Sequence, residues 1–189
     1  MSVIGDTTLR FSEEQAMLLD VAREFCRERS PISAVREHLE SANGFDAALW
    51  EEMVALGWAG ISLPESVGGS GLGVAALVPV LECMGRALLT GPLLSSSLAG
   101  QLLLRAGGES QAGHWLAEIA AGAPATVAWL ENGDWGDSSL QAQLDEQYVL
   151  RAGKRFVPDA VSARYLVVPA MHRGEIALAG VESGQLGEN

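Results

Sequence analysis

The chain has 189 residues, of which 48% are hydrophobic, so it holds enough apolar material for one or two small folded domains. Its formal net charge of −12 argues against nucleic-acid binding, which requires a basic surface, and against attachment to an anionic membrane. Cys26 and Cys83 form no CxxC pair, which favours buried thiols in a reducing compartment, and we expect a cytoplasmic protein.

The first two thirds of the chain have helical patterns. Ser12 and Gln15 have the spacing of a capping box, so the first helix is expected to begin there. A second helix is expected between Asp46, whose side chain can cap it, and Gly57, which ends it. The residues expected to face the core are Leu18, Val21, Ala22 and Phe25 in the first helix, and Leu49, Trp50, Met53 and Leu56 in the second.

Further helices are expected up to residue 122. One follows Gly73 and contains Pro79, which should bend it unless the helix begins nearby. The next begins at Pro92, ends before Gly107 and carries three consecutive serines. The last helix covers 109–122. The uncharged stretch 87–104 is interrupted by polar residues, glycine and proline, so no membrane insertion is expected.

At about residue 123 the pattern changes to short β-rich runs separated by Gly, Asn and Asp turns. These runs cover 125–131, 148–153, 163–170 and 175–182. Helices followed by strands predict an α+β fold, with an N-terminal all-α helical bundle over 1–122 and an incomplete antiparallel β domain over 123–189. The segment GKRFVPDA, residues 153–160, is expected to form the turn of a hairpin between the second and third runs.

Several motifs for other chemistries are absent or incomplete. GLGVAA, residues 71–76, matches a dinucleotide fingerprint, but no strand leads into it, so an interhelical loop is expected. His38, His114 and His172 lie far apart, and no metal site is predicted. No serine-hydrolase or P-loop motif occurs, so we predict no catalytic residue within these 189 residues.

Two of the five tryptophans lie outside helical core patterns. Trp129 ends a β run, and Trp135 lies in the polar turn NGDWGDS. A large ring in such a turn packs either on a flat ligand or another domain, or over the end of its own sheet. Core positions are expected for Trp50, Trp58 and Trp115.

The order of these segments resembles the acyl-CoA dehydrogenase family. Its N-terminal helical domain is similar to FSEEQAMLLDVAREFCRE, FDAALWEEMVALGWAGISLPESVGGSGLG and VLECMGRALL, and the loop LPESVGGSGLG is the most specific part. Its middle β domain is similar to ATVAWLENGDWGDS and YVLRAGKRFVPDAVSARYLVVPA. The resemblance extends from about Phe11 to Val181.

The resemblance implies FAD as cofactor, with a hydride taken from the β-carbon of an acyl-CoA while a carboxylate removes the α-proton. In that family a turn reading Thr-Glu-Pro-Gly-Ala-Gly-Ser-Asp follows the first strand, and positions 130–137 match it. Leu130 lacks the hydroxyl of the threonine, and Gly136 replaces the serine. The resemblance therefore implies flavin contacts from Trp129, Leu130, Trp135 and Gly136, and acyl-CoA contacts from Gly136 and Asp137.

A second flavin segment of the family reads Trp-Ile-Thr, and the matching residues are Phe156, Val157 and Pro158. Phe156 retains an aromatic ring, whereas Pro158 has neither a hydroxyl nor a backbone N–H. An ordinary hairpin stiffened by proline is the alternative. The family also places the helix of Ser95 and Ser96 near the acyl tail of the substrate, which implies substrate contacts from these two serines.

The third part of the family, a C-terminal helical bundle that carries the catalytic glutamate in most members, has no counterpart in residues 1–189. We therefore expect part of an acyl-CoA dehydrogenase of lipid metabolism, inactive alone, with its base outside this chain. Homo- or hetero-oligomerisation with other acyl-CoA dehydrogenase subunits is expected. Two alternatives stay open: a flavin-poor partner subunit of a heteromeric acyl-CoA dehydrogenase, and a non-enzymatic helical interaction module.

Overall fold

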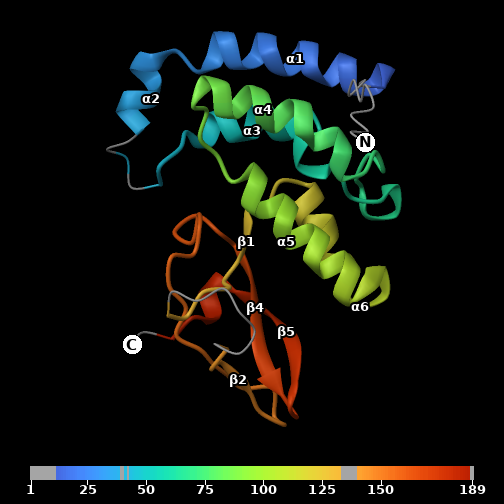
Figure 1. Ribbon diagram of the computed structural model, residues 1–189, viewed down its shortest axis with the longest axis vertical. Coiled ribbons are helices and arrows are strands. Elements are labelled where there is room, and N and C mark those ends of the chain that lie inside the picture. The colour runs from blue at the N-terminus through green and yellow to red at the C-terminus, as the bar shows by residue number, and fades with distance from the viewer. Residues whose placement is uncertain (1–11, 39–40, 42, 133–139, 188–189) are drawn as a thin grey trace, which may run out of the picture.

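The computed structural model describes residues 12–38, 41, 43–132 and 140–187. Its six α-helices precede a small five-stranded sheet, which confirms the α+β class. Figure 1 shows three tiers, with α1 to α4 at one end, α5 and α6 in the middle, and the sheet at the other end. No helix in the described ranges is both long and apolar enough to cross a membrane.

The first tier begins with α1, Glu13–Arg29, which has the predicted capping box. The Ser12 hydroxyl accepts from the amide of Gln15 at 3.2 Å, and the Gln15 side chain accepts from the amide of Ser12 at 3.0 Å. The buried residues of α1 are Ala22, Phe25 and Cys26, whereas Val21 is 45% exposed. The short helix α2, Ile32–His38, follows and was not predicted.

The helix α3, Ala47–Ala55, is capped by Asp46 as predicted, since its carboxylate accepts from the amide of Ala48 at 2.9 Å. The helix α4 spans Leu77–Ala87, so Pro79 lies in its first turn, where no hydrogen bond is lost. Three 3₁₀ turns lie between these helices: η1 Trp58–Gly60, η2 Glu65–Val67 and η3 Val74–Ala76. The ring of Phe25 meets that of Trp58 edge-on at 5.0 Å, within the core of this tier.

The glycine-rich loop between η2 and η3 is a close-packed interhelical connection, as predicted. No strand leads into it within residues 43–73. A Cβ on Gly69 would lie 2.2 Å from the carbonyl oxygen of Leu63, so only glycine fits there. The glycine at position 69 therefore allows the loop backbone to pack directly against the backbone of Leu63.

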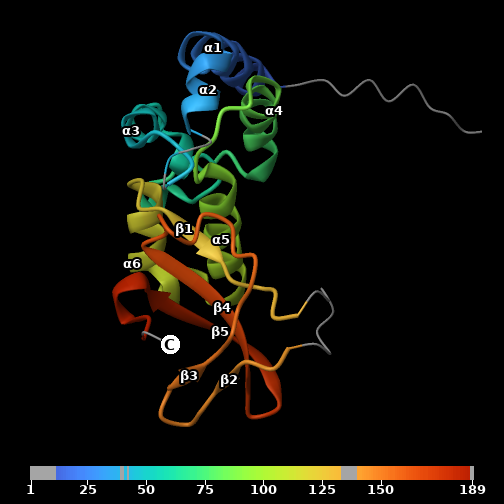
Figure 2. The same ribbon diagram turned by 90° about the vertical axis from the view of Figure 1, so that its left-hand side faces the viewer.

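The middle tier consists of α5, Leu93–Ala106, and α6, Gly108–Ala120. Both helices contribute to one core cluster with β1 and β4, so the helical part and the sheet share apolar contacts. Figure 2 shows α5 and α6 on the same side of the sheet. The strands are β1 Ala125–Val127, β2 Gln143–Leu144, β3 Leu150–Arg151, β4 Tyr165–His172 and β5 Glu175–Glu182, and η5 Ser183–Gln185 follows.

The sheet is mixed, which corrects the antiparallel β domain expected from sequence, since two of the four strand pairings among the described residues are parallel. β4 is central and pairs antiparallel with β5 through its whole length. β1 and β2 both run parallel to β4, at opposite ends of it. Parallel pairing is possible because long connections, which contain loops and the β2–β3 pair, join these strands to β4 in place of tight turns.

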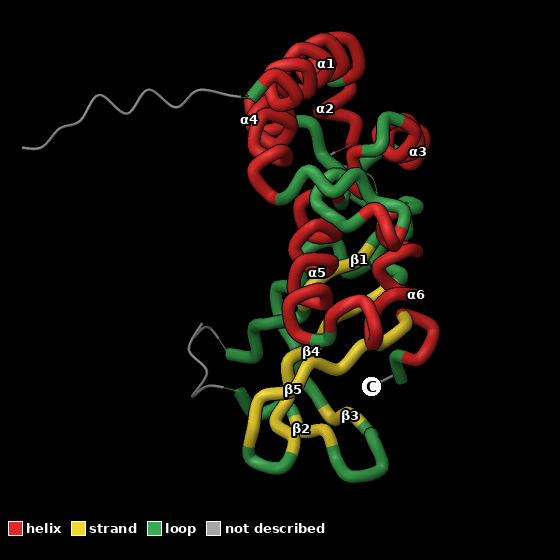
Figure 3. The backbone as a smooth tube through the Cα atoms, turned by 90° about the vertical axis from the view of Figure 1, so that its right-hand side faces the viewer, coloured by secondary structure: helices red, strands yellow, loops and turns green. Residues whose placement is uncertain are grey.

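The expected hairpin around residues 153–160 is also wrong. β2 lies between β3 and β4, and it pairs antiparallel with β3, so the segment 152–164 is a crossover loop. Two hairpins form elsewhere: β2 joins β3 through residues 145–149, and β4 joins β5 through Arg173 and Gly174, with φ of 53° and 85°. Two successive positive φ values suit a two-residue turn between antiparallel strands. Figure 3 shows the two loops at this end of the sheet.

β4 is buried on both faces, as its unbroken apolar sequence indicates. Tyr165 and Val167 contribute to the core under α5 and α6. Leu166 and Val168 contribute, with Val157, to a smaller cluster that lines a groove of about 900 Å³. The alternation follows from the two-residue period of a strand, and it puts the groove on the sheet face away from the helices.

Candidate functional site

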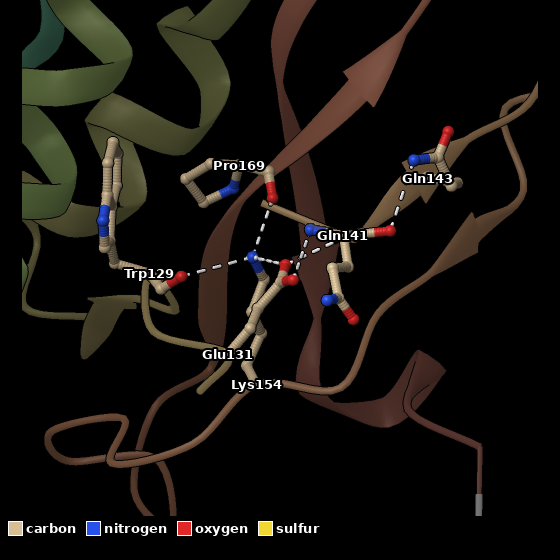
Figure 4. A network of polar contacts seen from close by, with 7 residues as sticks. Trp129, Glu131, Gln141, Gln143, Lys154 and Pro169 are labelled. Atoms are coloured by element: carbon tan, nitrogen blue, oxygen red, sulfur yellow. Dashed lines mark hydrogen bonds and ion pairs between the residues drawn. The ribbon is translucent and has the colours of Figure 1, made fainter. Parts of the chain in front are cut away.

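A buried ion pair joins the two segments that were expected to bind flavin. Nζ of Lys154 lies 2.6 Å from Oε1 of Glu131, and 7% of each side chain is exposed. Lys154 also donates to the carbonyls of Trp129, at 3.3 Å, and Pro169, at 2.9 Å. All three donor positions of the ammonium are therefore used, as Figure 4 shows.

The carboxylate of Glu131 is satisfied in the same way. It accepts from the backbone amides of Gln141, at 2.5 Å, and Ala142, at 3.0 Å. Burial raises its pKa, but the hydrogen bonds from Lys154 and from these amides outweigh burial and hold the pKa of Glu131 below its ordinary value. The Glu131 carboxylate is thus ionised at neutral pH, and the pair connects four segments of chain.

Sequence reasoning missed this pair as a unit. Glu131 is the last residue of the predicted β run 125–131, and Lys154 lies in the segment that was expected to form a hairpin turn, but nothing in the sequence placed them in contact. A polar hollow of about 510 Å³ lies beside the pair and is lined partly by Asn132, Arg151 and Arg155. The pair fixes the position at which the loop 155–160 leaves the sheet.

Phe156 stands out from the surface and does not pack into its own sheet. Its side chain is 82% exposed, and its φ is 51°, in the left-handed region that few residues with a Cβ adopt. Val157 is half-buried and packs against the cluster of Leu166 and Val168. Val157 thus anchors the loop on the sheet, and the neighbouring ring faces outward.

Pro158 is exposed, and its carbonyl oxygen accepts from the hydroxyl of Thr126 at 2.7 Å. Proline has no N–H, so this residue offers an incoming ligand no hydrogen-bond donor. Its carbonyl is already hydrogen-bonded to Thr126. Asp159 has φ of 51° and accepts from the hydroxyl of Ser95 at 2.5 Å. The loop is thereby tied to α5 and to β1.

The two serines expected to contact substrate are both buried. Ser95 is 6% exposed, and its hydroxyl lies between Asp159 and the carbonyl of Pro92, which is 3.1 Å away. Ser96 is 1% exposed and bridges the N–H and the carbonyl of Ala125, at 3.0 and 3.3 Å. Their contact with substrate stays a prediction.

The structure brings the end of β1 together with the crossover loop. Trp129 and Leu130 are half-buried, and the Leu130 carbonyl accepts from the amide of Arg155 at 2.7 Å. Trp135, Gly136 and Asp137, which were predicted to contact flavin or acyl-CoA, lie outside the described residues. Leu130, Phe156 and Pro158 therefore belong to one surface region.

This region offers a flat ligand one exposed aromatic ring on a loop held by hydrogen bonds. Covering an exposed aromatic side chain with a second apolar surface is favourable, by about 25 cal/mol for each Å² of apolar surface removed from water. Among the described residues no group of three His, Cys, Asp or Glu side chains is placed to hold a metal ion.

Comparison with known proteins identifies relatives. Residues 12–123 match the family model "Acyl-CoA dehydrogenase, N-terminal domain". The chain is 34% identical over 137 residues to the acyl-CoA dehydrogenase IpdE2 of Mycolicibacterium smegmatis, an alignment that covers 69% of this chain and 43% of that protein.

Solved structures that superpose on this chain include acyl-CoA dehydrogenases. A variant of the Tcur3481–Tcur3483 steroid ACAD superposes with a TM-score of 0.81 at 28% identity, covering 90% of this chain and 48% of that one. The ChsE4–ChsE5 complex from Mycobacterium tuberculosis superposes with a TM-score of 0.80 at 26% identity, covering 93% and 48%. The chain thus spans less than half the length of these relatives.

Proposed function

The chain belongs to the acyl-CoA dehydrogenase family, and from this premise we propose that it is part of a flavin-dependent enzyme that introduces an α,β double bond into an acyl-CoA thioester. The observation that carries the proposal is the ring of Phe156, 82% exposed at the position where the family has a flavin-contacting aromatic residue. A Phe156 ring packed inside the sheet could not contact a flavin and would have contradicted the proposal.

The residues present fit FAD at this one contact. Phe156 would lie against the flavin ring, and Leu130 and Trp129 would border it. When bound, the flavin would act as the acceptor of the hydride from the β-carbon of the thioester. Pro158 supplies no donor, so the chain would hold the ring by apolar contact more than by hydrogen bonds.

The other residues of the region hold the crossover loop in place and do not contact the ligand in this proposal. The ion pair of Lys154 and Glu131 holds the end of β1 against the crossover loop, and Val157 anchors that loop on the sheet. We place the carboxylate that removes the α-proton outside this chain, since the relatives are more than twice as long as the part matched. Acyl-CoA and a further polypeptide segment are then the expected partners.

A titration of the 189-residue protein with FAD, followed by flavin fluorescence, tests the proposal. We expect binding by the wild type and at least about tenfold weaker binding by Phe156→Ala, because the ring supplies most of the contact. The free energy of unfolding should stay the same, since the side chain is exposed. Val161→Ala is the matched control, because Val161 is 79% exposed in the same loop. Equal affinities of the two variants would contradict the proposal.

A second candidate is a flavin-poor subunit that pairs with a flavin-binding one. Pro158 and Leu130 favour it, because the former removes two donors and the latter one hydroxyl relative to the family. Two of the similar solved structures are named for two proteins each. Colourless protein that acquires flavin absorbance only with a second acyl-CoA dehydrogenase chain would support this candidate. Lack of colour in both arms, without acyl-CoA binding, would favour a non-enzymatic helical interaction module.

A further inference from the structure

The loop that carries Phe156 is strained at two positions other than glycine. Phe156 and Asp159 both have φ of 51°. This left-handed conformation is unfavourable for residues with a Cβ, and they adopt it only where surrounding contacts hold them there. The contacts that hold the loop are therefore the contacts that present the ring.

Two side chains from outside the loop supply such contacts. The hydroxyl of Ser95, on α5, lies 2.5 Å from Oδ2 of Asp159. The hydroxyl of Thr126, on β1, donates to the carbonyl of Pro158 at 2.7 Å. Ser95 is 6% exposed and Thr126 is fully buried, so water has little access to replace either hydroxyl. Ser95 makes the stronger class of bond, because its acceptor is a carboxylate.

Three consecutive serines on α5 differ in what they bind. Ser95 reaches Asp159, and Ser96 instead bridges the N–H and carbonyl of Ala125 on β1. Ser97 is also buried, but its hydroxyl has no hydrogen-bond partner in the part of the chain that the structure describes. Among the hydrogen bonds of the described residues, Ser95 is the one of the three serines that reaches the loop, and Ser97 is a control of the same residue type on the same helical turn.

We propose that Ser95 and Asp159 are a positioning pair that fixes the loop 156–159 so that the ring of Phe156 is held ready for its ligand. The proposal rests on the proposed function, since that ligand is FAD there. The pair acts through the backbone between residues 156 and 159, and neither side chain needs to touch the flavin. It gives the Ser95 hydroxyl a role in the loop in addition to any contact with substrate.

Hydrogen exchange of the full chain tests the pair without any ligand. The amides of Ser162 and Ala163 donate to the carbonyl of Asp159, at 3.1 and 2.9 Å, and so report on the loop. In Ser95→Ala we expect these amides to exchange at least about tenfold faster, the factor that follows from losing one charge-assisted bond. Ser97→Ala should leave the rates unchanged. Equal rates in the two variants would overturn the proposal.

Flavin binding supplies the second readout. FAD affinity should fall about tenfold in Ser95→Ala and in Asp159→Ala, and the double variant should lose little more, because both changes remove the same bond. Asp159→Asn keeps an acceptor and tolerates a left-handed backbone, so it should stay within about threefold of the wild type. The visible circular dichroism of bound flavin at saturation should differ in Ser95→Ala, which a mere loss of stability does not produce.

The two readouts separate the hypotheses. A wild type that binds no FAD contradicts the proposed function, and the exchange rates then decide alone whether the pair holds the loop. Faster exchange in Ser95→Ala with wild-type affinity and an unchanged flavin spectrum would show that the pair stabilises the loop without positioning the ring, and would overturn the inference.

Discussion

Nζ of Lys154 and Oε1 of Glu131, 2.6 Å apart and both almost fully buried, connect the end of β1 to the crossover loop. Backbone groups of Gln141, Ala142 and Pro169 are among the hydrogen-bond partners of the two side chains. A buried pair that is satisfied in this way is costly to break, because the remaining charge loses its compensation.

Replacement of Lys154 by methionine should therefore destabilise the protein strongly. The carboxylate of Glu131 would stay buried without its counter-charge, at a cost of about 3–5 kcal/mol. Urea unfolding followed by tryptophan fluorescence measures the loss. Arg155→Met, at the exposed neighbouring position, should change the free energy of unfolding by less than about 0.5 kcal/mol. A double variant Glu131→Gln and Lys154→Met should lose less than Lys154→Met alone, and an equal or greater loss would contradict this account.

The pH dependence of stability should contain the titration of Glu131. Its folded pKa is below the ordinary value, so its stabilising contribution is complete above the unfolded pKa of about 4.3 and is lost as the pH falls below it. The free energy of unfolding, measured in urea between pH 6 and pH 3, should fall more steeply for the wild type than for Glu131→Gln, by up to about 1.4 kcal/mol per pH unit. Asp145 and Glu14, whose pKa values are also lowered by backbone hydrogen bonds, titrate in both proteins. Parallel slopes would refute the assignment.

The packing of β5 on α6 depends on Gly180. A Cβ at this position would lie 2.6 Å from the ring of Trp115, which itself lies 4.6 Å from the ring of Tyr165. Gly180→Ala should cost about 1–3 kcal/mol of unfolding free energy through overpacking, and the added change Trp115→Phe should recover part of it. Gly184→Ala, where no atom lies within 4 Å of the new methyl group, is the control. Equal thermal midpoints of the two alanine variants would contradict the contact.

Pro158→Thr restores the hydroxyl and the N–H that the family has at this position. If the loop binds flavin, one added hydrogen bond should tighten FAD binding by about fivefold to tenfold. Fluorescence titration measures the change. Val161→Thr adds a hydroxyl to another exposed residue of the same loop and should leave the affinity as it is. An affinity unaltered by Pro158→Thr would mean that position 158 does not face the flavin.

The two thiols should be unreactive in the folded protein. Burial, with a smaller effect from the neighbouring Cys83, raises the pKa of Cys26 to about 11. Burial also raises the pKa of Cys83. Since the thiolate is the reactive form, a disulfide reagent at pH 8 should label neither cysteine rapidly, and should label both in concentrated urea. Rapid labelling of the native protein would show that the contact between α1 and α4 opens.

Local signals account for most of what the sequence predicted correctly. The capping box of Ser12 and Gln15 and the cap of Asp46 each depend on residues within one helical turn, and the structure contains them. Periodicity alone overestimated burial: Val21 and Leu56, both expected in the core, are each 45% exposed. Figure 3 shows α1 and α3, the helices that contain Val21 and end beside Leu56, on the outside of the first tier, where an apolar stripe is wider than the surface that covers it.

Long-range pairing accounts for most of what was missed. β2 has two residues, one of them the polar Gln143, and leaves no β signal of its own, yet it separates β3 from β4 and so removes the expected hairpin. The partner of Ser95 lies 64 residues away and that of Lys154 lies 23 residues away. No local pattern encodes such contacts, because the fold, and not the spacing, brings the groups together.

β5 pairs with β4 and with no other strand of the described sheet, so the outer edge of this eight-residue strand presents unpaired backbone groups. Such an edge is a template on which a second copy can add its own strand. Glutamates at both strand ends, within a chain of net charge −12, oppose that approach by electrostatic repulsion. Because dissolved salt screens repulsion between exposed charges, self-association along this edge is expected to increase with ionic strength.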